Sequence, residues 1–230
     1  MATLVDTITV VEYFHNLINS LRIVMYVPRY YAQEDPVKLF AFMHNNNFGI
    51  LFSHTGEEPM ASHLPFMIDE KVGGQGLIYG HMAKANRQWR YADGQQVMVV
   101  FHGPHAYVSP TWYLEDNVVP TWDYVAVHAI GIFKALEGRS DIEESVSRLT
   151  GLHESSQSKP WEMDYTTEYA DQMFKRIVGF QIEITGLKGK WKLNQNHSEV
   201  RRERVSERLK AEGGEANLQV AQLIDDDMAT

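Results

Sequence analysis

The sequence of 230 residues contains no cysteine. Disulfide bonds, thiolate nucleophiles and Cys-ligated zinc or iron–sulfur sites are therefore excluded. A long apolar run is also absent, because no stretch approaches the ~20 residues that a membrane-spanning helix needs. Near the amino terminus, Asp6 and Glu12 interrupt the pattern of a signal peptide. These absences predict a cytoplasmic protein that does not span a membrane.

Positive charge is scarce, since 21 Lys and Arg residues stand against 30 Asp and Glu residues and the net charge is −9. A field of this sign repels nucleic-acid phosphates unless a basic patch or a groove between subunits overrides it. Arginines do occur in the charged helix predicted over 199–211, but glutamates alternate with them, which is typical of a solvent-exposed, salt-bridged face. No basic recognition helix is evident, so DNA binding stays open.

Several signatures of catalysis and metal binding are missing as well. The chain has no GxSxG nucleophile motif, no phosphate-binding P-loop and no HExxH zinc motif. His102, His105 and His128 fit no strong metal-ligand spacing, and we expect no metal site. No general acid or base stands out, so the sequence by itself names no reaction.

Apolar periodicity divides the remaining sequence into helices and short strands. A stripe of apolar residues predicts a helix over 9–24, and Asp35-Pro36 is typical of the start of a second helix, which runs to His44. Turns rich in glycine then separate short extended segments, and a helical piece is expected over 83–89. The extended segments are 48–54, 60–68, 77–81, 97–101, 106–108 and 124–136. Short strands at this spacing favour a β-barrel.

The last third of the chain alternates helix and strand. Two helices are expected between 140 and 178, and a strand over 180–187 follows, with apolar residues on one side and polar residues on the other. The charged helix 199–211 comes next, and 225–230 is expected to fray. The predicted fold class is α+β, with a β-barrel at the centre and flanking helices.

The first candidate site combines residues from two neighbouring segments. His63 and His81 mark the ends of two predicted strands, and Lys84 and Asn86 belong to the short helical piece that follows the second. Backbone N–H groups, a cation and a helix start together bind phosphate. On residue types alone, structural histidines and a solvent-exposed lysine are the more common case. The candidate residues are Ser62, His63, Leu64, Pro65, His81, Lys84 and Asn86.

Aromatic and basic residues form a second candidate set. Trp122 and Tyr124 precede and begin the long predicted strand and face the same side of it. They would either stack on a flat ring or lie in an interface between subunits. The segment 188–196, with its three lysines, is the best anion-binding stretch by charge, and a lysine-bearing edge strand is the alternative.

Seven motifs, in this order and at compatible spacing, resemble those of the PaiB family of FMN-binding, negative regulatory proteins. They are Met25-Tyr-Val-Pro-Arg, Ala61-Ser-His-Leu-Pro, Gly80-His-Met-Ala-Lys-Ala-Asn, Phe101-His-Gly-Pro-His-Ala-Tyr-Val-Ser-Pro-Thr-Trp-Tyr, Val119-Pro-Thr-Trp-Asp-Tyr, Ile177-Val-Gly-Phe and Gly189-Lys-Trp-Lys-Leu-Asn-Gln-Asn. The resemblance leaves 1–24 outside as an extension. It divides the rest into a first part of the barrel core (25–138), a helical insertion (139–178), a final barrel strand with the basic segment (179–198) and a carboxyl-terminal helix and tail (199–230).

This resemblance implies a split β-barrel like that of the pyridoxamine-phosphate-oxidase and flavin-reductase superfamily, usually a homodimer with FMN at the subunit interface. It implies that Lys84, with Asn86, holds the flavin phosphate and that backbone groups around His63 and Leu64 meet the edge of the flavin ring. Residues of the partner subunit would close the pocket, and the basic segment would add contacts. These residues are Thr121, Trp122, Tyr124, Lys190 and Gln195.

Two residues depart from the family pattern. Asp123 stands where Asn is usual, and Asn194 stands where Ser is usual. A carboxylate beside a flavin phosphate is unfavourable, so Asp123 is expected to point away from it. The function implied by the resemblance is a transcription-related negative regulator with a flavin pocket. An FMN-dependent oxidoreductase or a haem-binding or haem-degrading enzyme is one alternative, and a structural dimer with an empty pocket is another.

Overall fold

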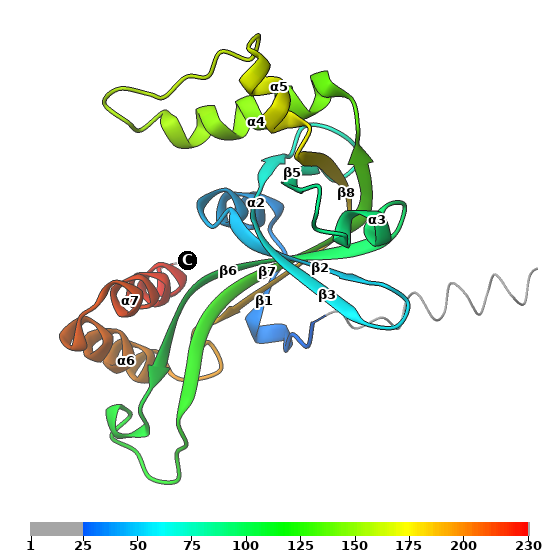
Figure 1. Ribbon diagram of the computed structural model, residues 1–230. Coiled ribbons are helices and arrows are strands. Elements are labelled where there is room, and N and C mark those ends of the chain that lie inside the picture. Colours follow the sequence, from blue (N-terminus) through cyan, green and yellow to red (C-terminus); the bar gives the residue numbers. More distant parts are fainter. Residues whose placement is uncertain (1–24, 230) are drawn as a thin grey trace, which may run out of the picture.

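The computed structural model describes residues 25–229, so the helix predicted over 9–24 lies outside the described residues. One strongly bent antiparallel sheet of eight strands forms the centre of the molecule (Figure 1). Seven strands follow the order β3-β2-β6-β7-β8-β5-β4, and β1 pairs with β8. The strands are β1 (Ala32–Gln33), β2 (Phe48–His54), β3 (Pro59–Pro65), β4 (Met67–Asp69), β5 (Leu77–Ala83), β6 (Gln96–Val108), β7 (Thr121–Leu136) and β8 (Ile177–Lys192).

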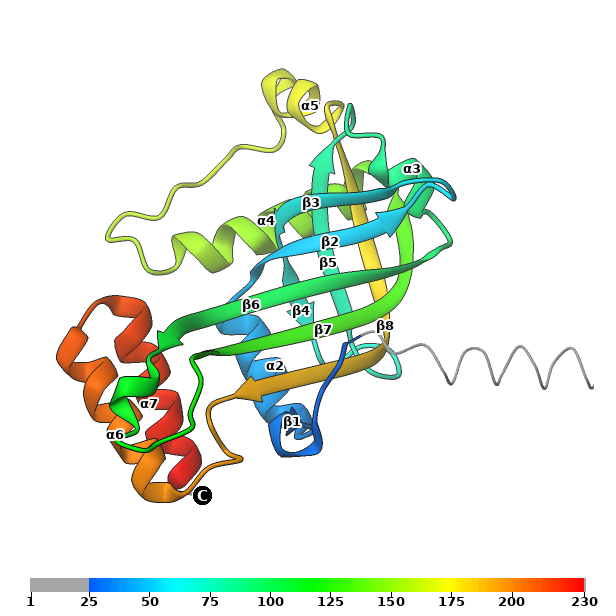
Figure 2. The ribbon, with the colours of Figure 1, turned by 90° about the horizontal axis from the view of Figure 1, so that it is seen from below.

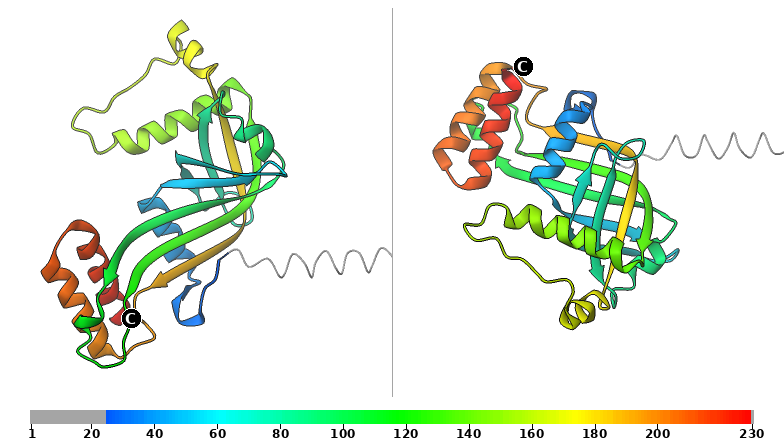
Figure 3. Two further views of the ribbon diagram at one scale, coloured as in Figure 1. Left: turned by 60° about the horizontal axis from the view of Figure 1, so that its bottom comes forward. Right: turned by 90° about the horizontal axis from the view of Figure 1, so that it is seen from above.

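Helices cover the sheet in separate places, with α4 and α5 at one end and α6 and α7 at the other (Figures 2 and 3). None of the helices within residues 25–229 is long and apolar enough to cross a membrane. This mixture confirms the predicted α+β class. The helices are α2 (Pro36–Asn45), α3 (Gln88–Ala92), α4 (Arg139–Glu154), α5 (Glu168–Phe174), α6 (Glu199–Glu212) and α7 (Glu215–Met228), with short 3₁₀ helices η1 (Arg29–Tyr31) and η2 (Pro110–Trp112).

Alternating residues of the long strands divide the sheet into an inner and an outer face. On β6, Val99 and Phe101 point to the inner face and are buried, whereas Met98 and Val100 point to the outer face. Apolar side chains of α2, α6 and α7 join the inner-face cluster. Burying a large side chain in this way contributes roughly 2–3 kcal/mol, so the inner face supplies most of the stability of the barrel.

Bulges bend the long strands without ending them. The pairing of β6 with β7 shifts register between His102 and His105. In the β7–β8 pair, Gly131 lies so close to its neighbour that a Cβ atom would come within 2.3 Å of the Glu183 carbonyl oxygen. The two short strands predicted on either side of Gly103-Pro104 are therefore one bulged strand, β6.

The segment after β5 differs from the helix predicted over 83–89. Lys84 and Ala85 form a turn in which the Lys84 backbone N–H donates to the Arg176 carbonyl oxygen at 2.7 Å. Helix α3 begins only at Gln88 and has five residues. So short a helix offers no amino-terminal anion site, and a phosphate near Lys84 would depend on side chains and on the N–H groups of the turn.

The carboxyl-terminal tail is helical, so the expected fraying over 225–230 is wrong up to Met228. Arg202 of α6 pairs with Asp227 at 2.6 Å, and Lys210 pairs with Asp225 at 2.5 Å. The apolar side of α7 is buried against α6 and the inner face of the sheet through Val220, Ala221 and Ile224. The acidic residues at the end of the chain favour a prediction of fraying, whereas the apolar residues between them pack α7 against α6 and the sheet.

Candidate functional site

Ser62 and Asn86 are brought together by Gln88, which no sequence pattern singles out. The Ser62 hydroxyl donates to Gln88 Oε1 at 2.5 Å and accepts from Asn86 Nδ2 at 2.8 Å. The Gln88 side chain is 1% exposed, and its Nε2 donates to the Leu51 carbonyl oxygen and to Ser53 Oγ, both at 3.1 Å. Because its polar atoms are all bonded, this network fixes the turn after β5 against β2 and β3.

Lys84 lies apart from that network. Its side chain lines a cavity of about 480 Å³ between the barrel and helices α4 and α5. Within residues 25–229 its ammonium group has neither a hydrogen-bond nor an ion-pair partner. An unpaired ammonium group beside a cavity is suited to bind a phosphate or a carboxylate group.

The remaining members of the first set face two different sides of the molecule. His63 is exposed on the outer face of β3, and Leu64 and Pro65 beside it are half-buried. His81 lies on β5 opposite Gly179, on the side covered by α4, and its Nδ1 has no hydrogen-bond partner among the described residues. Burial lowers the pKa of His81, so its ring is neutral at pH 7. The structure does not bring the two histidines together.

Most of the second set lies where β7 begins and β8 ends. The Lys192 ammonium group donates to the Thr121 hydroxyl and, at 2.5 Å, to the Trp122 carbonyl oxygen. The Lys190 ammonium nitrogen lies 5.3 Å from the ring centre of Tyr124. Thr121, Trp122, Tyr124 and Lys190 thus form one group, as their positions on paired strands require.

Gln195 closes the turn that follows β8. Its Nε2 donates to the Trp191 carbonyl oxygen at 2.9 Å, and its Oε1 accepts from the Leu193 N–H at 2.8 Å. Both ends of its amide are therefore engaged within the turn. A contact between Gln195 and FMN would have to replace one of these bonds.

An open groove of about 540 Å³ lies on the outer face of β6, β7 and β8. Its lining includes Tyr26, His102, His105, Trp122, Tyr124, His128 and Lys190. Nδ1 of His128 is buried and has no hydrogen-bond partner among the described residues, and burial lowers the pKa of this histidine. Within residues 25–229, no three His, Asp or Glu side chains are placed to hold a metal ion. The groove therefore offers aromatic walls, imidazole groups and one ammonium group.

One residue of each candidate set, Lys84 and Tyr124, lies far from the other within a single chain. Leu136, at the end of β7, lines the same cavity as Lys84, whereas Tyr124 lies near the start of that strand. At ~3.3 Å per residue, roughly 40 Å of strand separates Tyr124 from Leu136. Figure 2 shows the two ends of β7 on opposite sides of the sheet. Lys84 and Tyr124 of one chain therefore border different hollows of the surface.

The two residues that depart from the family pattern contact each other. Asn194 Nδ2 donates to Asp123 Oδ2 at 2.7 Å, and Asp123 is 0% exposed. Its Oδ1 has no hydrogen-bond partner among the described residues, and Lys192 Nζ lies 3.9 Å away. Burial raises the pKa of Asp123 to about 7, although Lys192 and Arg202 act in the opposite direction. This carboxyl group faces the interior, whereas Trp122 and Tyr124 face the groove.

Comparison with known proteins now identifies the family. Residues 25–186 match the family described as "Putative FMN-binding domain". The chain belongs to this FMN-binding-domain family. Its relatives include the "Protease synthase and sporulation protein PAI 2" of Bacillus subtilis, which is 33% identical over 205 residues that cover 88% of this chain and 97% of the relative. The resemblance to the PaiB family is thereby confirmed.

Solved structures show the same fold for this member of the FMN-binding-domain family. The flavocytochrome Anf3 from Azotobacter vinelandii superposes with a TM-score of 0.56 at 11% identity and covers 72% of each chain. The FAD and haem binding protein from Mycobacterium smegmatis superposes with a TM-score of 0.56 at 12% identity and covers 80% of each chain. The predicted fold, a flavin-type split barrel with flanking helices, is confirmed.

Proposed function

We propose that this protein is a homodimer that binds FMN between its two subunits. The observation that carries the proposal is the separation of Lys84 from Tyr124 on one chain, together with the groove on the outer face. Lys84 and Asn86 of one subunit would hold the flavin phosphate, because Lys84 has an unpaired ammonium group. Trp122 and Tyr124 of the other subunit would supply an aromatic wall for the flat ring.

The outer face has the character of an interface between subunits. Trp122 is 54% exposed and Tyr107 is 46% exposed, and their rings meet edge to face at 5.8 Å. Exposed aromatic residues that form one patch mark a surface that a partner covers, because Trp and Tyr are frequent anchors of interfaces. His63 lies on this face in one cross-strand row with Val100 and His128, which connects the first set to the groove.

Titration of the full chain with FMN tests this proposal. We expect FMN fluorescence to be quenched at one FMN per subunit, and light scattering to report a dimer. Lys84→Ala should weaken FMN binding roughly 10- to 100-fold, because it removes a charge-assisted hydrogen bond to phosphate. Lys71→Ala, at the other end of β5, is the matched control and should change nothing. A monomer that retains FMN would exclude the interface site, and a dimer without FMN affinity would leave only a structural role.

The biological role we propose is that of a transcription-related negative regulator in the cytoplasm, which follows the resemblance to the PaiB family. The net charge of −9 favours an indirect effect over direct DNA binding. We expect no retardation of promoter DNA by the FMN-loaded protein at 150 mM salt. A sequence-specific complex at that salt concentration would contradict the indirect role.

A haem-binding function is the second candidate, because three histidines line the groove beside Trp122. Two structures of the same fold are described as a flavocytochrome and as an FAD and haem binding protein. If haem binds there, His128→Ala should shift or abolish the Soret band of the haem-loaded protein. His54→Ala, at the exposed end of β2, serves as the control, and identical spectra for both variants would remove His128 as a haem ligand. Loss of the Soret band when a reductant is added to the haem-loaded protein in air would indicate haem degradation and favour the enzymatic alternative.

A further inference from the structure

The α4–α5 insertion and the barrel enclose the cavity of about 480 Å³ that Lys84 borders. Cavities of roughly 300–1,000 Å³ hold small organic molecules. One side of this cavity is apolar and is formed by Leu136, Phe174, Ile177 and Val178, and Trp89 adds an indole ring. The Trp89 Nε1–H donates to the Lys84 carbonyl oxygen at 3.2 Å, which fixes the ring against the turn after β5.

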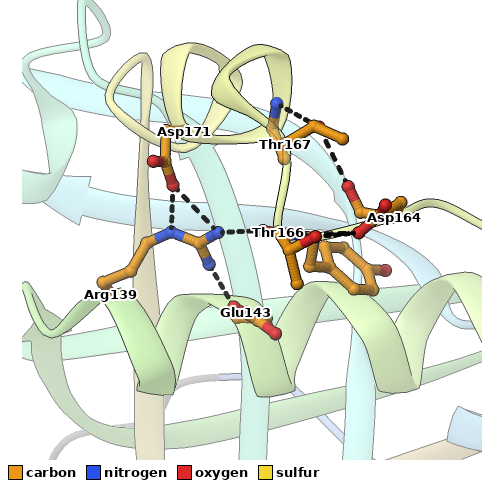
Figure 4. Close-up of polar contacts among 8 residues, drawn as sticks. Arg139, Glu143, Asp164, Thr166, Thr167 and Asp171 are labelled. Atoms are coloured by element: carbon orange, nitrogen blue, oxygen red, sulfur yellow. Dashed lines mark hydrogen bonds and ion pairs between the residues drawn. The ribbon is translucent and has the colours of Figure 1, made fainter.

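The wall of the cavity is held in place by Arg139, at the start of α4 (Figure 4). Its Nε and Nη2 each lie 3.3 Å from Asp171 Oδ1 on α5, and Nη2 donates to the Tyr165 carbonyl oxygen at 3.0 Å. Its Nη1 pairs with Glu143, and the guanidinium carbon lies 3.8 Å from the ring centre of Phe174. The cavity is therefore formed before any ligand enters.

The charged groups around the cavity divide into a paired cluster and three unpaired groups. The carboxylate of Asp171 is paired with Arg139, which also pairs with Glu143 outside the cavity. Lys84 and Lys175 also line the cavity, and neither ammonium group has a partner among residues 25–229. Against them, Glu137 is the lining carboxylate that has no partner in the same part of the chain. Two unpaired ammonium groups beside an apolar wall suit an anion with an apolar body.

We propose that this cavity is a second small-molecule site, which binds an amphipathic organic anion. The carboxylate or sulfonate group of the ligand pairs with Lys175, and its apolar body lies against Phe174 and Trp89. The site does not depend on the FMN proposal, because Lys175, Phe174 and the Arg139 cluster belong to the insertion and not to either candidate flavin set. Lys84 stands at the border, where it remains free to contact a flavin phosphate.

Fluorescence titration of the full chain with 8-anilinonaphthalene-1-sulfonate tests the site. We expect saturable binding of one probe per chain, displacement by decanoate and no displacement by decyltrimethylammonium, which has the same chain length but the opposite charge. Lys175→Ala should weaken probe binding about tenfold, and Lys175→Arg should restore it, since one charge-assisted contact is worth about this factor. Ile177→Trp should abolish binding because the larger ring fills the cavity.

Two further results separate this site from the flavin pocket and from nonspecific dye binding. FMN should not displace the probe, and Lys175→Ala should leave the FMN titration unchanged. Stoichiometric displacement by FMN would show that the cavity belongs to the flavin site and would overturn the proposal. Probe binding that is indifferent to both Lys175→Ala and Ile177→Trp would place the dye on the outer face of the sheet, and this too would overturn it. Circular dichroism of each variant confirms that it folds.

Discussion

The inner and outer faces of the sheet are made from alternating residues of the same strands, yet along β6 only the inner face is covered. On β6, Val99 and Phe101 are completely buried beneath helices, whereas Val100 and Tyr107 on the opposite side line or flank an open groove. Both faces are rich in apolar and aromatic residues. A sheet whose second face met only water would carry polar residues there. This difference supports the proposal that a second subunit, with FMN, covers the outer face.

Removing one aromatic ring from each face of the sheet should give the largest difference in stability between the two faces. Phe101→Ala should lower the free energy of unfolding by roughly 3–5 kcal/mol, because it leaves a cavity beside Phe66, whose ring centre lies 5.7 Å away. Tyr107→Ala, on the outer face, should cost less than about 1 kcal/mol when both variants are made in a Trp122→Glu background, where no partner covers this ring. Urea unfolding at one fixed protein concentration measures both. Equal losses would show that the two faces do not differ as described.

A charge on the outer face should separate the subunits without unfolding them. Trp122→Glu is expected to raise the dimer dissociation constant at least ~100-fold, which corresponds to ~2.7 kcal/mol, because a carboxylate would be buried against apolar groups. Sedimentation equilibrium measures this constant. Val119→Glu, at an exposed site in the loop before β7, should leave it unchanged. If Trp122→Glu remains a dimer of equal affinity, the interface lies elsewhere.

The buried amide of Gln88 tests whether the polar network on the inner side of the sheet supports flavin binding. Gln88→Leu removes the amide that holds Ser62 and Asn86, and it should cost roughly 1–3 kcal/mol because polar groups of β2 and β3 lose their partner. The same variant should weaken FMN binding, since the turn that carries Asn86 is no longer fixed. Gln172→Leu, exposed on α5, is the matched control for both measurements. An unchanged FMN affinity would separate the network from the flavin site.

The buried carboxyl group of Asp123 predicts a pH dependence of stability. Its pKa is about 7 in the folded protein against 3.8 for an ordinary Asp, so the folded state binds this proton more tightly. The stabilisation is complete below about pH 4 and is lost as the pH rises towards 7, by at most ~1.4 kcal/mol per pH unit. Asp123→Asn should remove this slope from unfolding curves between pH 5 and pH 7. Asp116→Asn, in an exposed loop, should keep it.

Local sequence patterns predicted the structure correctly where neighbouring residues determine it. Asp35-Pro36 starts α2, and the Asp35 side chain accepts from the Val37 N–H at 2.9 Å as a capping residue does. The alternation of Phe180, Ile182 and Ile184 predicts the buried side of β8. Local patterns did not predict structure that depends on a distant contact. After β5, the backbone hydrogen bond from Lys84 to Arg176 holds a turn where a helix was predicted, and α3 begins only at Gln88.

The sequence by itself determined the α+β class, the strand segments, the family and the residue types available for a flavin. Only the tertiary structure decided which of these residues meet. Gln88 reaches Ser62 from 26 positions away, and Asn194 reaches Asp123 from 71 positions away, because the order of strands in the sheet brings them together. The same order places Lys84 beside the cavity that Leu136, at the end of β7, also lines, and leaves Tyr124 near the start of that strand. Periodicity is set by adjacent residues, whereas these contacts depend on how the whole sheet closes, which no local pattern encodes.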